Sequence, residues 1–195
     1  MTRPLHTFAG CPRENDFVNS FQESVFVLGM RDASFFASDL FWEAFRTAFP
    51  TPPRKMVMEP STTSGTWRQY VAFYKWSKSS VEAVAFGNFI RYRDVYLEGG
   101  LCARRHFYRR LPPPHWRECR DRGGIVQILL TQAAKELDDA TAWFGYCGDA
   151  KSWLVNERIG YHRTRHQHLI VKWFRDLPEP KQRELEDEIA AIGPF

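Results

Sequence analysis

The residues best suited to chemistry are a glycine pair beside two arginines, at the start of a helical pattern. Gly123 and Gly124 follow Arg120 and Arg122 closely. The apolar spacing from Val126 onward predicts a half-buried helix. Backbone N–H groups converge at a glycine-flanked helix N-terminus, and the helix dipole adds positive potential there. This stretch therefore predicts a phosphate-binding loop, while a glycine pair alone is also compatible with an ordinary turn.

A second candidate is Glu98, a carboxylate inside the apolar run of residues 95–103. Partial burial raises the pKa of a carboxyl group toward neutral pH, which makes it a usable general base for an ammonium substrate. The competing interpretation is a structural glutamate held in a salt bridge. Gly99 and Gly100 follow it, and glycines in a strand permit either a bulge or the close approach of another backbone.

Hydrophobic periodicity places these residues in an alternation of strands and helices. Strands are expected over residues 25–28, 69–76, 81–91, 95–103, 142–146 and 169–173. Helices are expected over residues 38–49, 115–122, 126–137, 150–159 and 178–195. Because short turns separate the runs within 69–103, these three strands are expected to form an antiparallel meander.

Two motifs in this framework resemble those of the GCN5-related N-acetyltransferase superfamily. Residues 149–161, DAKSWLVNERIGY, are similar to that family's pattern N-x-x-A-x-x-L-Y-x-K-x-G-F, without a gap. Residues 120–125, RDRGGI, lead into a helix with a Leu-Leu pair and are similar to its R/Q-x-x-G-x-G/A pyrophosphate loop. The sequence departs from the family at Ile125 (usually Gly or Ala), Asp149 (usually Asn) and Asn156 (usually the tyrosine that protonates the leaving thiolate).

The resemblance implies an α/β fold with a central, mostly antiparallel mixed sheet and helices on both faces. It implies an acyl-CoA-dependent N-acyltransferase that uses acetyl-CoA or another acyl-CoA and a small-molecule or peptide amine acceptor. Glu98 would take the acceptor proton, and Tyr146 or Asn156 would act on the departing sulfur. The implied cofactor contacts lie on the strand, the loop and the next helix: Leu101, Cys102, Ala103, Arg120, Arg122, Gly123, Gly124, Ile125, Val126, Asp149 and Ser152.

Composition limits the class of protein. With 195 residues and 44% apolar content, we expect one domain over residues 1–195, with an arm at 1–16 and a helical extension at 178–195. The net charge of +4 mildly favours anionic ligands. Four scattered cysteines without a C-x-x-C pair argue against a zinc ribbon or a disulfide scaffold. Without an apolar run of about 20 residues or a secretory leader, we expect a cytoplasmic protein without membrane contact.

Other functions stay open. Asn156 in the tyrosine position is compatible with a catalytically silent acyl-CoA or nucleotide sensor. Residues 104–122 carry seven arginines among aromatic residues, a composition that can bind nucleic acid. The two acidic residues in this stretch and the modest net charge argue against that interpretation. We favour a short helix over 115–122 that covers the cofactor loop.

Two further expectations concern the C-terminal third of the chain. His162, His166 and His168 lack additional ligands at a fixed short spacing, so no metal site is expected. The helix at 178–195 is acidic on its outer side, and it could cover the sheet or contact a second copy. A homodimer is therefore left open.

Overall fold

The computed structural model describes residues 20–33, 35–36, 40, 67–148 and 150–195. The arm at 1–16, most of the helix expected at 38–49, and Asp149 lie outside the described residues. The strands are β1 Val25–Met30, β2 Trp67–Ser77, β3 Ser80–Tyr92, β4 Val95–Ala103, β5 Ala142–Tyr146, β6 His162–Arg163 and β7 Leu169–Trp173. The helices are α1 Phe21–Ser24, α3 Phe107–Arg110, α4 Pro113–Asp121, α5 Ile125–Glu136, α6 Ala150–Arg158 and α7 Glu179–Ile192.

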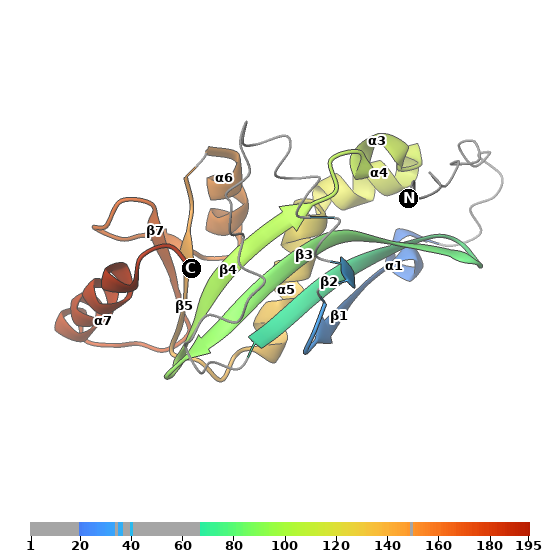
Figure 1. Ribbon diagram of the computed structural model, residues 1–195. Coiled ribbons are helices and arrows are strands. Elements are labelled where there is room, and N and C mark those ends of the chain that lie inside the picture. The colour runs from blue at the N-terminus through green and yellow to red at the C-terminus, as the bar shows by residue number, and fades with distance from the viewer. Residues whose placement is uncertain (1–19, 34, 37–39, 41–66, 149) are drawn as a thin grey trace, which may run out of the picture.

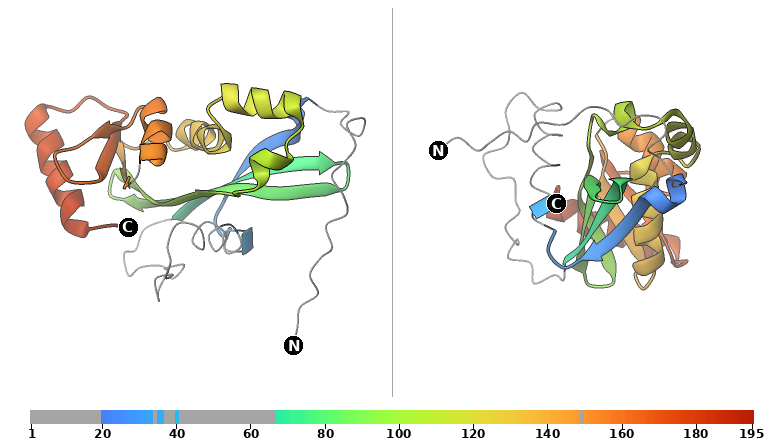
Figure 2. Two further views of the ribbon diagram at one scale, coloured as in Figure 1. Left: turned by 90° about the horizontal axis from the view of Figure 1, so that it is seen from above. Right: turned by 90° about the vertical axis from the view of Figure 1, so that its right-hand side faces the viewer.

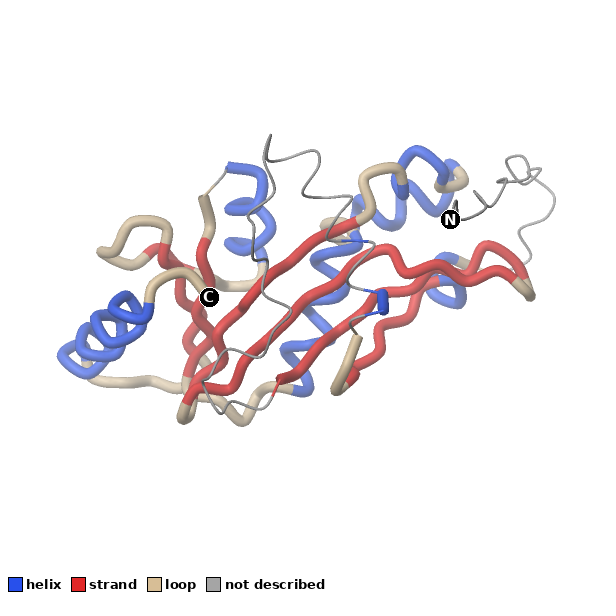
Figure 3. The backbone as a smooth tube through the Cα atoms, viewed as in Figure 1, coloured by secondary structure: helices blue, strands red, loops and turns tan. Residues whose placement is uncertain are grey.

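The seven strands form one twisted sheet in the order β1-β2-β3-β4-β5-β7-β6 (Figures 1 and 3). Strands β4 and β5 are parallel, and every other neighbouring pair is antiparallel. The expected mostly antiparallel mixed sheet with flanking helices is confirmed. The single parallel pair matters for function because β5 returns beside β4 after the crossover through α5.

Alternate residues of each strand face opposite sides of the sheet, so the chain builds a core on each face. On one face, Phe89 and Trp143 pack in the cluster that includes Leu129 of α5. On the other face, Phe144 packs in a cluster that includes Ile189 of α7. Figure 2 shows α4, α5 and α6 on the same side of the sheet and α7 at its far end. The sheet is therefore a rigid support between two apolar layers.

Helix α5 forms where the 3.6-residue period predicted it and begins one residue earlier. Ile125, Leu129 and Ala133 are fully buried against the sheet. Gly87 of β3 lies beneath the helix, where a Cβ atom would approach Leu129 Cδ2 to 2.9 Å. This close approach explains why the strand carries a glycine there, since any side chain would push α5 away from the sheet.

The arginine-rich segment between β4 and α5 folds into α3 and α4, whereas only one helix was expected there. Glu82 on β3 anchors the segment, because its carboxylate pairs with Arg110 at 2.9 Å and Arg104 at 3.1 Å. The same carboxylate accepts the Trp76 indole N–H at 2.6 Å. Part of the arginine content is therefore structural.

Candidate active site

The two central parallel strands separate after a short region of pairing. Strand β4 pairs with β5 only from Val95 to Glu98, while its pairing with β3 continues to Ala103. From Gly99 onward, none of the described strands lies on the β5 side of β4, and most of these residues are partly exposed. The register with β3 slips at Gly99, which is the bulge of one extra residue allowed by the glycine pair. Among the described strands, β5 therefore leaves this edge of β4 uncovered beyond Glu98.

Glu98 occupies the last paired position before the strands separate. The residue is half-buried as a whole, but its carboxyl group is enclosed by protein. Burial raises the pKa of this carboxyl to about 7, and a hydrogen bond from Tyr161 opposes the rise. Among the described residues, no cation forms a salt bridge with Glu98, so the structural salt-bridge interpretation gains no support. The group has the properties expected of a general base near neutral pH.

Tyr161 is the partner that sequence reasoning missed. Its hydroxyl donates to Glu98 Oε2 at 2.9 Å, and the residue is 1% exposed. Burial and the neighbouring carboxyl group raise the pKa of this phenol well above its ordinary value, so it stays protonated and able to donate. It follows Gly160, whose φ of +96° favours glycine, after the end of α6. The Gly-aromatic end of the second motif marked this position without indicating the contact.

Tyr146 and Asn156, the two residues predicted to act on the leaving group, do not lie together. Tyr146 packs in the cluster of Phe144, on the face of the sheet opposite to the cluster that holds Tyr161. Asn156 is 3% exposed on α6, and its backbone carbonyl accepts the Tyr161 N–H at 3.1 Å. Its side-chain oxygen has no hydrogen-bond partner in the described part of the chain. Catalytic roles for Tyr146 and Asn156 stay predictions, and the contact between Asn156 and Tyr161 is a backbone hydrogen bond.

The glycine loop differs from the expected phosphate-binding geometry. The Gly123 N–H donates to the Arg120 carbonyl at 2.8 Å, and the Gly124 N–H donates to the Cys119 carbonyl at 2.8 Å. These amides close the end of α4 and do not point to a common open position. The expectation of free amides at Gly123 and Gly124 is therefore wrong, and the reason is that a helix precedes the loop and uses them.

A tyrosine occupies the start of α5. The Ile125 N–H donates to the Tyr108 hydroxyl oxygen at 3.1 Å, and a Cβ atom at Gly124 would lie 2.9 Å from that oxygen. The side chain of Gln127 folds over Gly123, whose Cβ position is 2.9 Å from Gln127 Cγ. Protein side chains therefore cover the helix N-terminus that was expected to receive an anion.

The remaining predicted cofactor residues divide between structural and accessible positions. Arg120 pairs with Asp121 at 3.0 Å and Arg122 pairs with Glu118 at 2.8 Å, so both guanidinium groups have carboxylate partners. The side chains of Leu101, Cys102 and Ile125 pack into apolar clusters. Ser152 lies exposed on α6. Ala103 and Val126 are partly buried at the ends of β4 and α5 facing the loop. Cofactor contact by these residues stays a prediction.

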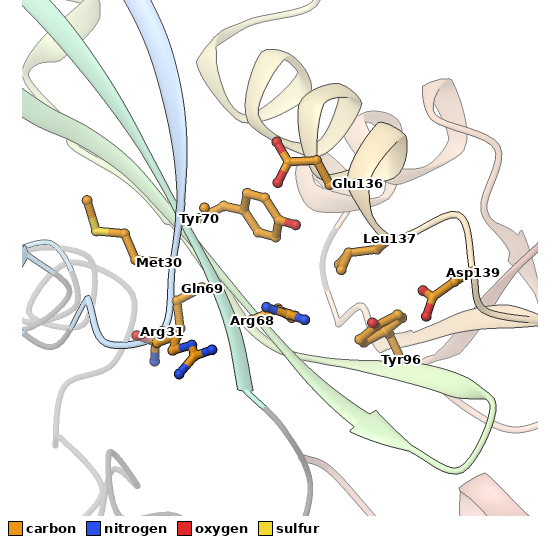
Figure 4. Close-up of a pocket in the computed structure, with 10 residues that line it drawn as sticks. Met30, Arg31, Arg68, Gln69, Tyr70, Tyr96, Glu136, Leu137 and Asp139 are labelled. Atoms are coloured by element: carbon orange, nitrogen blue, oxygen red, sulfur yellow. The ribbon is translucent and has the colours of Figure 1, made fainter.

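A separate polar hollow of about 330 Å³ lies at the other end of α5 (Figure 4). Tyr70 and Tyr96 line it from the sheet, and Glu136 lines it from α5. Burial raises the pKa of the Tyr70 phenol, and the charge of Glu136 and a hydrogen bond to its carboxylate raise it further. The sequence patterns did not predict this hollow. Neither Glu98 nor its partner Tyr161 lines it.

The comparisons with known proteins concern the fold. No protein-family model and no curated protein matches the sequence. A solved structure of a proposed N-acetyltransferase from Lactobacillus plantarum superposes with a TM-score of 0.50 at 12% identity, over 78% of this chain and 99% of that one. This chain has the GCN5-related N-acetyltransferase fold. A ribosomal-protein-S18-alanine N-acetyltransferase from Escherichia coli aligns with a TM-score of 0.48 at 11% identity, over 80% and 97% of the two chains.

The described residues contain neither a metal-binding cluster nor a membrane-spanning helix. No group of three or more His, Cys, Asp or Glu side chains in this part of the chain is arranged to hold a metal ion. His166, one of the three clustered histidines, instead contacts Asp187 at 2.7 Å. None of the helices in the described ranges has the length and apolar character that a bilayer-spanning segment requires.

Proposed function

We propose that the chain is an N-acyltransferase that moves an acyl group directly from a thioester to an amine, with acyl-CoA as the predicted donor. The observation that carries this proposal is the Glu98–Tyr161 pair at the point where β4 and β5 separate. A carboxyl group with a pKa of about 7 is poised to exchange protons at neutral pH. The N-acetyltransferase fold supports the proposal by supplying this strand geometry.

The proposed chemistry requires a proton acceptor near the acyl carbon. The acceptor's ammonium group loses a proton to Glu98, directly or through a water molecule because the carboxyl group is enclosed. The neutral amine nitrogen then bonds to the acyl carbon and the carbon–sulfur bond breaks. The nitrogen loses its second proton, and the departing thiolate takes up a proton, so that an amide and a free thiol are released. Tyr161 holds the carboxylate in place and limits the rise of its pKa.

The donor's pantetheine arm and its diphosphate differ in how well they suit this protein. The pantetheine arm contains two amides and can pair with the free edge of β4 beyond Glu98 as an added strand would. The diphosphate would need the amides at the start of α5, which Tyr108 and the end of α4 already occupy. The chain therefore suits the arm and not, in this arrangement, the diphosphate.

The direct test is thiol release from acetyl-CoA in the presence of a panel of primary amines, arylamines and peptides. We expect at least one amine to accelerate thiol release, with the acetylated amine identified by mass spectrometry. Binding of the thioester without release for any acceptor class would contradict the transferase proposal.

A silent acyl-CoA or nucleotide sensor is the second candidate. It is favoured by Asn156, whose carboxamide cannot act as a proton donor in the way a tyrosine does, and whose side-chain oxygen is unpaired in the described structure. The two candidates differ in turnover. A sensor would bind the thioester and release no thiol above the spontaneous rate.

We expect Tyr161→Phe to shift the pH profile of kcat/KM to higher pH. The phenol stabilises the ionised form of Glu98, so its loss raises the pKa of Glu98 above about 7. One hydrogen bond accounts for up to about one pH unit, which predicts about a tenfold loss at pH 6 and a smaller loss at pH 8. Tyr70→Phe is the matched control, because its hydroxyl contacts Glu136 instead, and its profile should not move. An unshifted profile in Tyr161→Phe would remove Tyr161 as a positioning residue.

A further inference from the structure

Backbone N–H groups at the start of α5 donate to other parts of the protein, and this restricts which acyl donor can bind. In an α-helix the first four N–H groups lack partners within the helix and are the usual anion donors. Here Gly124 and Ile125 donate to Cys119 and Tyr108. Burial raises the pKa of the Tyr108 phenol, so a neutral hydroxyl oxygen occupies a position suited to a phosphate oxygen. The Ile125 N–H therefore has a hydrogen-bond acceptor without a ligand.

The two remaining first-turn amides belong to Val126 and Gln127, beside a loop that is already crowded. The Gln127 side chain lies against Gly123, and its Oε1 atom is buried without a hydrogen-bond partner among the described residues. The nearby guanidinium groups of Arg120 and Arg122 pair with carboxylates. A diphosphate would have to displace Tyr108 before it gained the Ile125 N–H, which would reduce its net contribution to binding.

The edge of β4 beyond Glu98 lies beside a buried amide side chain, that of Asn88. Asn88 on β3 is 7% exposed, and its Nδ2 atom lies 3.1 Å from the Cβ position of Gly99. The side-chain oxygen of Asn88 is buried and has no hydrogen-bond partner in the described ranges. Such groups are rare in native proteins, because a buried acceptor without a hydrogen bond destabilises the folded state. This buried acceptor, with the β4 backbone, suits a ligand that carries amide N–H donors.

From these two observations we propose that this chain recognises its acyl donor through the pantetheine arm alone. The inference rests on the proposed function, and it extends the donor class from acyl-CoA to pantetheine thioesters that carry no nucleotide. Such a thioester can be a free acyl-pantetheine, or it can be an acyl group on the phosphopantetheine arm of a carrier protein. Arg109 and Arg117 are exposed, and neither forms an ion pair within the described part of the chain, so an acidic carrier has cations to contact.

The test compares the affinity and turnover of the whole protein for three donors with the same acetyl group. They are acetyl-CoA, acetyl-pantetheine, and an acyl carrier protein charged with acetyl-phosphopantetheine. We expect acetyl-CoA and acetyl-pantetheine to bind within about threefold of each other, because the N–H groups of Gly123, Gly124 and Ile125 already donate within the protein. Tighter binding of the charged carrier protein would support the inference and identify the carrier as the source. Acetyl-CoA binding about 30-fold or more tighter than acetyl-pantetheine would overturn the inference and leave the transferase proposal standing.

Tyr108→Ala provides the complementary result, because it opens the start of α5. We expect the affinity ratio of acetyl-CoA to acetyl-pantetheine to rise about tenfold or more, since the Ile125 N–H becomes available to a charged oxygen. Tyr108→Phe removes only the hydroxyl and should give a smaller rise, so it serves if the alanine variant does not fold. An unchanged ratio in a folded variant would contradict the role of Tyr108. If none of the three donors binds the unaltered protein, both the inference and the proposed function fail.

Discussion

Glu98→Gln should lower turnover by about 10²- to 10⁴-fold while leaving thioester affinity nearly unchanged. This range is the usual contribution of a positioned general base, and the glutamine side chain cannot accept the amine proton. The substitution keeps the size of the side chain and an oxygen that can accept from the Tyr161 hydroxyl. A loss confined to turnover would therefore report on the proton transfer and not on packing. The measurement is single-turnover thiol release together with calorimetric titration of the donor.

Glu136→Gln is the matched control for this experiment. Glu136 is also a carboxylate that contacts a tyrosine hydroxyl, that of Tyr70, but it lies at the end of α5 that faces the separate polar hollow (Figure 4). We expect its turnover to equal that of the unaltered protein. If both variants turn over as fast as the unaltered protein, Glu98 is not the base. If both lose the same share of turnover, the substitutions affect the fold in general.

The fold could be predicted to the extent that local pattern determines it. The strands expected at 142–146 and 169–173 match β5 and β7, because turn residues bound short runs of apolar side chains. The single turn of α3, Phe107–Arg110, was missed because four residues are too few to show a period. Strand β6, His162–Arg163, was also missed, since it is polar and exists through its pairing with β7.

The candidate site was only half predictable, for a different reason. The run around Glu98 indicated a carboxylate with a raised pKa, because burial can be read from its apolar neighbours. The contact with Tyr161 joins residues 63 positions apart, and the contact between Tyr108 and Ile125 joins residues 17 apart. No local pattern encodes such pairs. The glycine loop was misread because its amides were counted as free before the preceding helix, which consumes them, was known.

The environment of Glu98 should also make the free energy of unfolding depend on pH, whatever the activity proves to be. Its pKa is about 7 in the folded protein and about 4.5 when unfolded, so between these values the folded state holds more protons. Stability from this group is therefore full below about pH 4.5 and is lost as the pH rises through 7. The shift corresponds to a decline of about 3 kcal/mol, an upper value for an enclosed carboxyl group.

The variant Glu98→Gln isolates this contribution because it removes the titrating proton and leaves all other groups in place. Urea unfolding at pH 5, 6, 7 and 8 should show the variant gaining about 2–3 kcal/mol relative to the unaltered protein across this range. Other titrating groups, such as Glu186, affect both proteins equally and cancel in the difference. A difference that stays constant with pH would show that the carboxyl group is solvated. It would then lack the raised pKa on which its role as a base depends.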